Sequence, residues 1–218
     1  MTVDIAVIDY GMGNLRSVSK AIEYVAPECR VVVTNDPAVV EQAERVVFPG
    51  QGAMPDCMRE LKASGLHAAV LSAAQTKPFL GICIGLQMLF ECSEEGDTPG
   101  LGLLPGQVQR FPASLMQQAD GTRLKVPHMG WNEVWQAVKH PLWDQIADGS
   151  RFYFVHSYFL VPGDQQIVAG WSDYPFRFAC AVARGSLFAV QFHPEKSQAA
   201  GLQLLSNFVK WKPGLSGL

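Results

Sequence analysis

A cysteine set between two glycines is the group in this sequence best suited to covalent chemistry. Cys83 ends the apolar, strand-like run 79–83 and is followed at once by a helix-like run, in the arrangement Gly81-x-Cys83-x-Gly85. A residue on such a sharp strand-to-helix turn is pushed out of the sheet, and small neighbours let the backbone approach itself closely. Free N–H groups at a helix N-terminus favour the thiolate, the nucleophilic form of cysteine. The spacing therefore predicts that Cys83 is a covalent nucleophile.

A histidine and a glutamate near the C-terminal end could supply the base. His193-Pro194-Glu195 follows the strand-like run 188–192. Residues i and i+2 of an extended segment share a face, so His193 and Glu195 should project together past the strand end. A histidine oriented by a carboxylate is the base half of a catalytic triad. An isolated His-Pro-Glu would be interpreted as a surface turn, but beside a nucleophile elbow the catalytic interpretation is favoured.

The elements that must position these groups alternate strand and helix through the first half of the chain. The predicted strands are 3–9, 30–34, 45–48 and 79–83, and the predicted helices are 14–25, a short one opening at 35–37, and helical material within 54–75. This alternation indicates an α/β fold of three layers, with a mostly parallel central sheet flanked by helices. In such sheets the reacting groups gather at the carboxyl ends of the strands, where both Cys83 and the Pro49-Gly50-Gln51-Gly52 turn lie.

From Gly100 onward the pattern changes to short strands joined by turns, which predicts an added antiparallel β segment. The predicted strands are 108–111, 124–126, 152–156, 167–171, 179–182 and 187–192, and a closing helix is predicted at 197–211. No repeat or linker interrupts the chain. Residues 1–218 are therefore predicted to form a single domain.

The composition argues against several other classes of protein. The 218 residues are 48% hydrophobic, enough for a buried core, and their formal net charge of −3 comes without a long basic run, which argues against nucleic-acid binding. No stretch of 18 uncharged apolar residues and no basic leader occur, so we expect neither a membrane span nor a signal peptide. Five cysteines without a Cys-x-x-Cys pair indicate a reducing cytoplasm rather than disulfides or zinc. The four besides Cys83 are expected to be small buried side chains.

Two further patterns do not support a cofactor. His128, His156 and His193 lack the spacing of a metal-binding cluster, so no metal is predicted. Gly11-Met12-Gly13 has the first part of a dinucleotide-binding loop, but Arg16 stands where the third glycine belongs. No cofactor is therefore expected.

The nucleophile and histidine–glutamate motifs resemble those of the class I (triad) glutamine amidotransferases, and the resemblance spans essentially the whole chain. It rests on Gly81-Ile-Cys-Ile-Gly-Leu-Gln87 and Phe192-His-Pro-Glu195. It implies a flavodoxin-like fold, L-glutamine as substrate, and a triad of Cys83, His193 and Glu195. It also implies that the oxyanion donors are the backbone N–H groups of Gly52 and Ile84, and that the glutamine-binding residues are Gln87, Ser157 and Tyr158.

Within that family the chain looks most like the glutaminase subunits of imidazole glycerol phosphate synthase, through segments 9–14, 127–132, 153–158 and 192–197. The resemblance implies a heterodimer in which ammonia passes to a (β/α)₈-barrel cyclase subunit. That subunit makes imidazole glycerol phosphate and aminoimidazole-carboxamide ribotide in histidine biosynthesis. Asn14, Trp131 and Lys196 are expected to face the cyclase. Gln51 departs from the pattern, since members often carry a small or branched apolar residue there.

Three other functions remain open on the sequence alone. A glutaminase subunit serving a different synthase would carry the same triad. A stand-alone cysteine hydrolase on this fold would act without a partner. A non-catalytic regulatory module is disfavoured, because it has no need of Cys83, His193 and Glu195 together.

Overall fold

The computed structural model describes residues 3–117, 121 and 123–214, and thirteen strands in this part of the chain form one mixed sheet. The strands are β1 (Ile5–Ile8), β2 (Val31–Thr34), β3 (Arg45–Gly50), β4 (Phe79–Cys83), β5 (Phe90–Ser93), β6 (Thr98–Pro99), β7 (Leu104–Arg110), β8 (His128–Gln136), β9 (Ser150–His156), β10 (Tyr158–Pro162), β11 (Val168–Asp173), β12 (Arg177–Arg184) and β13 (Leu187–Val190). Their order is β2-β1-β3-β4-β13-β12-β10-β7-β5-β6, and β11 joins β12 to β8, which in turn pairs with β9.

The helices are α1 (Leu15–Val25), α2 (Pro37–Gln42), α3 (Met54–Ala63), α4 (His67–Thr76), α5 (Ile84–Gln87) and α6 (Gln198–Lys210). Short 3₁₀ turns occupy Glu95–Asp97, Ala113–Leu115, Pro141–Trp143, Gln165–Ile167 and Pro194–Lys196. A local signal explains where α2 begins. Asp36 caps α2 by accepting a hydrogen bond from the Ala38 N–H at 2.9 Å, and Pro37 takes the first helical position.

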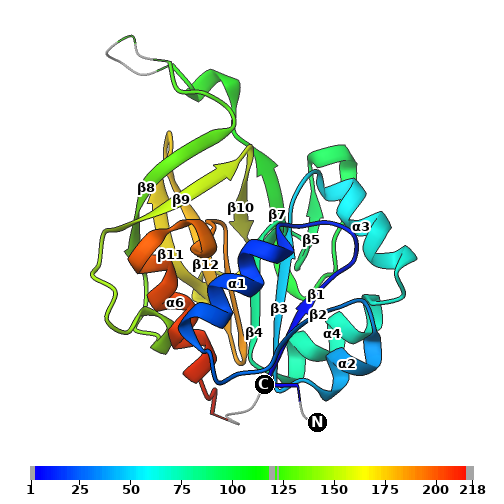
Figure 1. Ribbon diagram of the computed structural model, residues 1–218. Helices are drawn as coiled ribbons and strands as arrows, with labels where there is room; N and C mark the ends of the chain where they lie inside the picture. The colour runs from blue at the N-terminus through cyan, green and yellow to red at the C-terminus, as the bar shows by residue number, and fades with distance from the viewer. Residues whose placement is uncertain (1–2, 118–120, 122, 215–218) are drawn as a thin grey trace.

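One half of the sheet is parallel throughout. Strands β2, β1, β3, β4 and β13 pair in parallel, and β1 and β4 are buried along their whole length. Strands covered on both faces are continuous apolar runs, because each side chain meets a helix layer. Figure 1 shows α1 and α6 on one side of these strands and α2, α3 and α4 on the other. The predicted three-layer α/β fold is confirmed.

The other half is mainly antiparallel, as the second half of the sequence predicted. Strand β12 pairs antiparallel with β13, β10 and β11, and β8 pairs antiparallel with β9 and β11. The strand predicted at 124–126 was wrong. The Leu124 N–H bonds to the Met116 carbonyl and the Lys125 N–H to the Tyr174 hydroxyl, so this segment has no strand ladder, and β8 begins only at His128. Strands β5, β6, β8 and β10 were not predicted.

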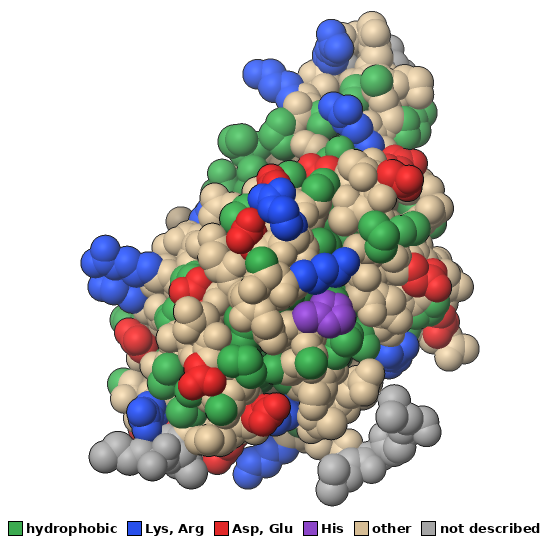
Figure 2. All heavy atoms as spheres, turned by 90° about the vertical axis from the view of Figure 1, so that its right-hand side faces the viewer, with side chains coloured by type: hydrophobic (Ala, Val, Ile, Leu, Met, Phe, Trp, Pro, Cys, Tyr) green, Lys and Arg blue, Asp and Glu red, His purple; other side chains and the backbone are tan. Residues whose placement is uncertain are grey.

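The surface corrects one further expectation. Cys57 and Cys180 are buried and Cys29 is half-buried, but Cys92 on β5 is exposed. Positive and negative side chains are interspersed over the body of the face that carries α2, α3 and α4 (Figure 2). Among the described residues, no helix is long and apolar enough to cross a membrane.

Candidate active site

Three neighbouring parallel strands end at one place on the sheet. Strand β4 lies between β3 and β13, with Gly50 opposite Cys83 and Val190 opposite Ile82. The segments that follow β3 and β13 therefore meet beside Cys83 at the carboxyl edge. This is the arrangement that the sequence pattern predicted.

Cys83 occupies a strained elbow. Its backbone has φ 56° and ψ −113°, a region that non-glycine residues rarely adopt and that is often associated with function. The glycines around it are required by space, because a Cβ on Gly85 would lie 1.9 Å from the Phe48 carbonyl oxygen, and one on Gly50 would lie 2.7 Å from the Gly85 nitrogen. Helix α5 is only one turn long, so its free N–H groups rather than a long helix dipole act on the sulfur.

His193 and Glu195 lie together, as predicted, although the chain reaches this geometry differently. Strand β13 ends at Val190 and Glu195 belongs to a 3₁₀ turn, yet His193 Nδ1 and Glu195 Oε1 are 2.9 Å apart. The histidine backbone is tied to β9, since the His193 N–H donates to the Tyr153 carbonyl at 2.9 Å. The Ser197 hydroxyl completes the anchor by donating to the His193 carbonyl and accepting from the Tyr153 N–H.

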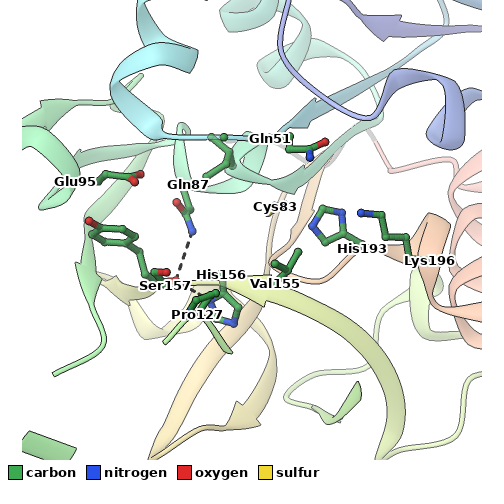
Figure 3. Close-up of a pocket in the computed structure, with 13 residues that line it drawn as sticks. Gln51, Cys83, Gln87, Glu95, Pro127, Val155, His156, Ser157, His193 and Lys196 are labelled. Atoms are coloured by element: carbon green, nitrogen blue, oxygen red, sulfur yellow. Dashed lines mark hydrogen bonds between the residues drawn. The ribbon is translucent and has the colours of Figure 1, made fainter. Parts of the chain in front are cut away.

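The environment of His193 favours a charged ring. Burial opposes the imidazolium, but interactions with Cys83 and Glu195 outweigh it and raise the pKa of His193 to about 10. Its Nε2 atom is buried without a hydrogen-bond partner among the described residues. Figure 3 shows the ring beside Cys83. Such a pair suits a thiolate nucleophile with an imidazolium that can give up its proton.

A cavity of about 220 Å³ opens over these groups. That volume is below the roughly 300–1,000 Å³ of pockets that hold drug-sized ligands, so it suits a small metabolite. Apart from Glu195, which lies behind His193, the cavity wall includes every predicted catalytic, oxyanion and glutamine-binding residue: Cys83, His193, Gly52, Ile84, Gln87, Ser157 and Tyr158.

Comparison with known proteins identifies the family. A family profile described as "Glutamine amidotransferase class-I" matches residues 6–211. The chain belongs to the class-I glutamine amidotransferases. The family inferred from the two sequence motifs is thereby confirmed.

Individual relatives of this amidotransferase narrow the family to one branch. Two proteins described as "Imidazole glycerol phosphate synthase subunit HisH" are similar along nearly their whole length. The one from Thiobacillus denitrificans is 67% identical over 214 residues, which cover 98% of this chain and 94% of the relative. The one from Aromatoleum aromaticum is 68% identical over 210 residues, with 96% and 99% covered. The branch indicated by the motifs away from Cys83 is also confirmed.

A solved structure, that of PurLQS from Thermotoga maritima, shares the amidotransferase fold at low sequence identity. Its TM-score is 0.67 over 96% of this chain and 99% of that one, at 19% identity. The fold is therefore kept where most of the sequence differs.

The turn that follows β3 is held by two side chains. The Tyr10 hydroxyl donates to the Pro49 carbonyl at 3.1 Å, and the buried Cys57 thiol donates to the Gln51 carbonyl at 3.5 Å. Because C=O and N–H point in opposite directions across a trans peptide, the Gly52 N–H points away from Cys57. The Gln51 side chain is exposed, so this departure from the family pattern does not enter the core.

The sequence reasoning missed two polar residues of this amidotransferase, Gln191 beside Cys83 and Glu95 in the pocket wall. Gln191 is fully buried, and its Nε2 donates to Cys83 Sγ at 3.8 Å while its Oε1 accepts from Gln87 Nε2 at 3.0 Å. A lone polar residue inside the apolar run 188–192 was the available signal. Among the described residues, Glu95 is the only carboxylate in the pocket wall, and it lies at the opposite end from His193 (Figure 3). It was missed because the acidic stretch 94–97 resembles a solvated turn.

The three residues expected to face a partner lie at different points around the site. Asn14 precedes α1, and its side chain makes no capping hydrogen bond. Trp131 is 39% exposed on β8, with its ring edge against Tyr153. Lys196 lies at the pocket edge beyond His193 (Figure 3). No group of three or more potential metal ligands occurs among the described residues.

Proposed function

We propose that this chain hydrolyses L-glutamine to glutamate and ammonia with Cys83, His193 and Glu195, and delivers the ammonia to a separate cyclase subunit. One observation carries the proposal. The strained cysteine faces a buried histidine whose Nδ1 is 2.9 Å from a carboxylate and whose Nε2 is left without a partner among the described residues. A thiolate, a proton donor and an orienting carboxylate are the groups that amide hydrolysis requires.

In the proposed reaction, the Cys83 thiolate attacks the side-chain carboxamide carbon of glutamine. His193 gives its proton to the departing nitrogen as the C–N bond breaks, which leaves a γ-glutamyl thioester and free ammonia. His193 then takes a proton from water, and the resulting attack on the thioester releases glutamate. Glu195 keeps the Nδ1 proton in place and stabilises the imidazolium at each stage.

The oxyanion donors that we propose are the N–H groups of Ile84 and Gly52. Both residues line the pocket, and the orientation of the Gln51–Gly52 peptide turns the Gly52 N–H away from Cys57. Removing one such donor typically slows an enzyme by about 10²–10³-fold.

The distribution of charge in the pocket supports one orientation of glutamine. Glu95 and the Gln87 side-chain oxygen, which is buried without a partner among the described residues, are acceptors for the α-ammonium group. We assign the α-carboxylate to the backbone around Ser157 and Tyr158. The carboxamide then reaches Cys83 at the other end of the pocket.

The partner that we propose is the (β/α)₈-barrel cyclase subunit of imidazole glycerol phosphate synthase, in a heterodimer. The relatives are named as subunits of that synthase. Met129, Trp131 and Trp135 lie on one face of β8 with 62%, 39% and 38% of their surface exposed, and the exposed Glu133 lies between the two tryptophans on the same face. Exposed large apolar side chains gathered on one strand are of the kind that docks a protein partner. Asn14 and Lys196 complete the proposed contact. The cyclase would then form imidazole glycerol phosphate and aminoimidazole-carboxamide ribotide for histidine biosynthesis.

Two broader assignments accompany this function. We propose that residues 1–218 act as one glutamine amidotransferase domain, consistent with a family match that runs from residue 6 to 211. We also assign the protein to the cytoplasm, where the free thiols would stay reduced.

The variant Cys83→Ala tests the nucleophile. In the complex with the cyclase, its glutamine-dependent synthesis should fall by about 10⁶-fold, the scale of losing a covalent nucleophile. Synthesis from added ammonium salt should stay normal, because ammonia then bypasses the glutaminase. The matched control is Cys92→Ala, which removes an exposed thiol and should leave both activities unchanged. Glutamine-dependent turnover that survives in Cys83→Ala would contradict the assignment.

A further inference from the structure

A chain of hydrogen bonds that reaches the pocket wall at His156 uses two buried histidines that the triad does not employ. His128 begins β8 and lies opposite His156, the last residue of β9. His128 Nδ1 and His156 Nε2 are 2.9 Å apart, and His156 Nδ1 is 2.7 Å from the Tyr158 carbonyl oxygen. At the other end, Asn132 Nδ2 is 3.3 Å from His128 Nε2. Both imidazole rings are about 95% buried.

The Tyr158 carbonyl at the end of this chain determines which atom donates and which accepts in every bond. A carbonyl oxygen can only accept, so Nδ1 of His156 carries a proton and Nε2 is left to accept from His128 Nδ1. His128 Nε2 then accepts from the Asn132 amide nitrogen. Burial lowers the pKa of His128 to about 4 and of His156 to about 3, so each ring is neutral and has the single proton that this arrangement needs. The chain therefore has one consistent polarity, ending at the Tyr158 carbonyl.

The same carbonyl, together with the Gln191 side-chain oxygen, sets the orientation of Gln87. Gln87 Nε2 lies 3.5 Å from the Tyr158 oxygen and 3.0 Å from Gln191 Oε1, so both amide protons have acceptors. Only the Gln87 side-chain oxygen remains, buried without a partner among the described residues. Figure 3 shows the nitrogen turned toward the dashed bond and the oxygen turned the other way. Gln87 therefore presents a hydrogen-bond acceptor, and not a donor, to the pocket.

We infer that His128 and His156 are positioning residues for glutamine binding. They fix the Tyr158 carbonyl, which holds Gln87 so that its oxygen accepts from the substrate α-ammonium. This inference rests on the proposed function, because it assigns the ammonium end of glutamine to Gln87. Without this chain of hydrogen bonds, the Gln87 amide can rotate and present N–H groups that repel an ammonium ion. The loss should weaken binding much more than the chemical step at Cys83.

If His128 had a purely structural role, that role would come from the stacking of its ring and not from its hydrogen bonds. Its ring stacks on Tyr174 with centroids 4.0 Å apart and planes 16° from parallel, and on Phe154 at 5.0 Å and 24°. Two substitutions separate the roles. His128→Phe keeps a flat ring in the stack and removes the Nδ1 donor. His128→Asn removes the ring and keeps an amide donor near the Nδ1 position.

The first measurement is steady-state glutaminase kinetics of each variant in the complex with the cyclase. We expect His128→Phe to raise KM for glutamine about tenfold, the effect of losing one buried hydrogen bond, with kcat within about twofold of the parent. His128→Asn should keep KM within about threefold, although its melting temperature falls further than that of His128→Phe. A parental KM in His128→Phe, or a larger KM change in His128→Asn than in His128→Phe, would overturn the inference.

The second measurement separates this inference from the proposed function. The electrophilic glutamine analogue 6-diazo-5-oxo-L-norleucine carries the α-amino and α-carboxylate groups, whereas iodoacetamide carries neither. At subsaturating concentration, the analogue should modify Cys83 about tenfold more slowly in His128→Phe than in the parent, while iodoacetamide should modify both at one rate. Equal rates with the analogue would refute the positioning role alone. No modification of the parent by the analogue would refute the glutamine site itself, and the positioning role with it.

Discussion

On the side of the pocket that carries Cys83, backbone packs directly on backbone, whereas on the side that carries Tyr158 the backbone is held by side-chain hydrogen bonds. A Cβ on Gly85 would meet the Phe48 carbonyl at 1.9 Å, so the elbow exists only because no side chain is present. The Tyr158 carbonyl instead accepts from His156 at 2.7 Å and Gln87 at 3.5 Å. We call these two sides the Cys83 wall and the Tyr158 wall. The Cys83 wall is held by close backbone packing that leaves no room for a side chain, and the Tyr158 wall is held by hydrogen bonds.

The difference separates the two tasks of the proposed reaction. A nucleophile needs a fixed position against its base and oxyanion donors, and close packing supplies this with little freedom to relax. Recognition of an amino acid needs acceptors and donors of the correct kind, which hydrogen-bonded amides and imidazoles supply. Changes to the Cys83 wall should therefore alter kcat or folding, and changes to the Tyr158 wall should alter KM.

Among the tests of this division, Glu195→Gln gives the largest expected effect. It probes a place where the Cys83 wall depends on a side-chain bond. Glu195 Oε1 is 2.9 Å from His193 Nδ1, and both side chains are almost completely buried. An amide cannot stabilise the imidazolium as a carboxylate does, so kcat should fall by about 10⁴-fold, as in other triads that lose this charge. KM for glutamine should change little. A variant that lost affinity and kept kcat would place Glu195 in the binding wall and break the comparison.

Gly85→Ala should have the next largest effect, on folding. The added methyl group would have to displace the backbone of β3, so we expect a loss of about 4 kcal/mol or more in the free energy of unfolding, measured by urea titration. The control is Gly130→Ala on β8. There φ is +135° and no atom lies within 4 Å of a new Cβ, so only backbone strain of about 1–3 kcal/mol is expected. Equal losses in the two variants would show that close packing does not distinguish the walls.

The same contrast explains which parts of the site could be predicted from sequence. Close packing requires glycines at fixed local spacing, so Gly81-x-Cys83-x-Gly85 indicated the elbow, and the boundaries of β4 were predicted correctly. Parallel strands with buried faces also leave long apolar runs, which indicated the sheet and the meeting of Cys83 with His193. Each of the motifs behind these predictions lies within a short segment of the chain, and the rule that parallel strands end at one edge brings the segments together.

The Tyr158 wall depends on the register of paired strands, which could not be predicted from the sequence. The bond between His128 and His156 exists because β8 and β9 pair with these residues opposite each other. Without that register, each histidine was only a polar residue in an aromatic segment. Gln191 was missed for a similar reason, because its partners Cys83 on β4 and Gln87 on α5 lie more than a hundred residues away in the chain.

The smallest expected effect is an opposite response of the two walls to pH. Burial lowers the pKa of His128 to about 4 and of His156 to about 3, against an unfolded value near 6.5. Between pH 6.5 and about 4 the unfolded chain therefore binds more protons, and the free energy of unfolding should fall as the pH falls. His140, away from the pocket, acts in the same direction because burial also lowers its pKa to about 4.

His193 should give the opposite limb. Its pKa is raised to about 10 in the folded chain, where interactions with Cys83 and Glu195 outweigh burial. The proposed thiolate–imidazolium pair therefore holds one proton up to about pH 10, whereas in the unfolded chain the same proton sits on the thiol and is lost above about pH 8.5. The free energy of unfolding should therefore decrease as the pH rises from about 8.5 to about 10. Urea titrations from pH 4.5 to 9.5 should show His128→Asn flattening only the acid limb and Cys83→Ala flattening only the alkaline limb. If either substitution changed the acid and alkaline limbs equally, the two walls would be electrostatically coupled. The proposed separation of glutamine binding from the chemical step would then be wrong.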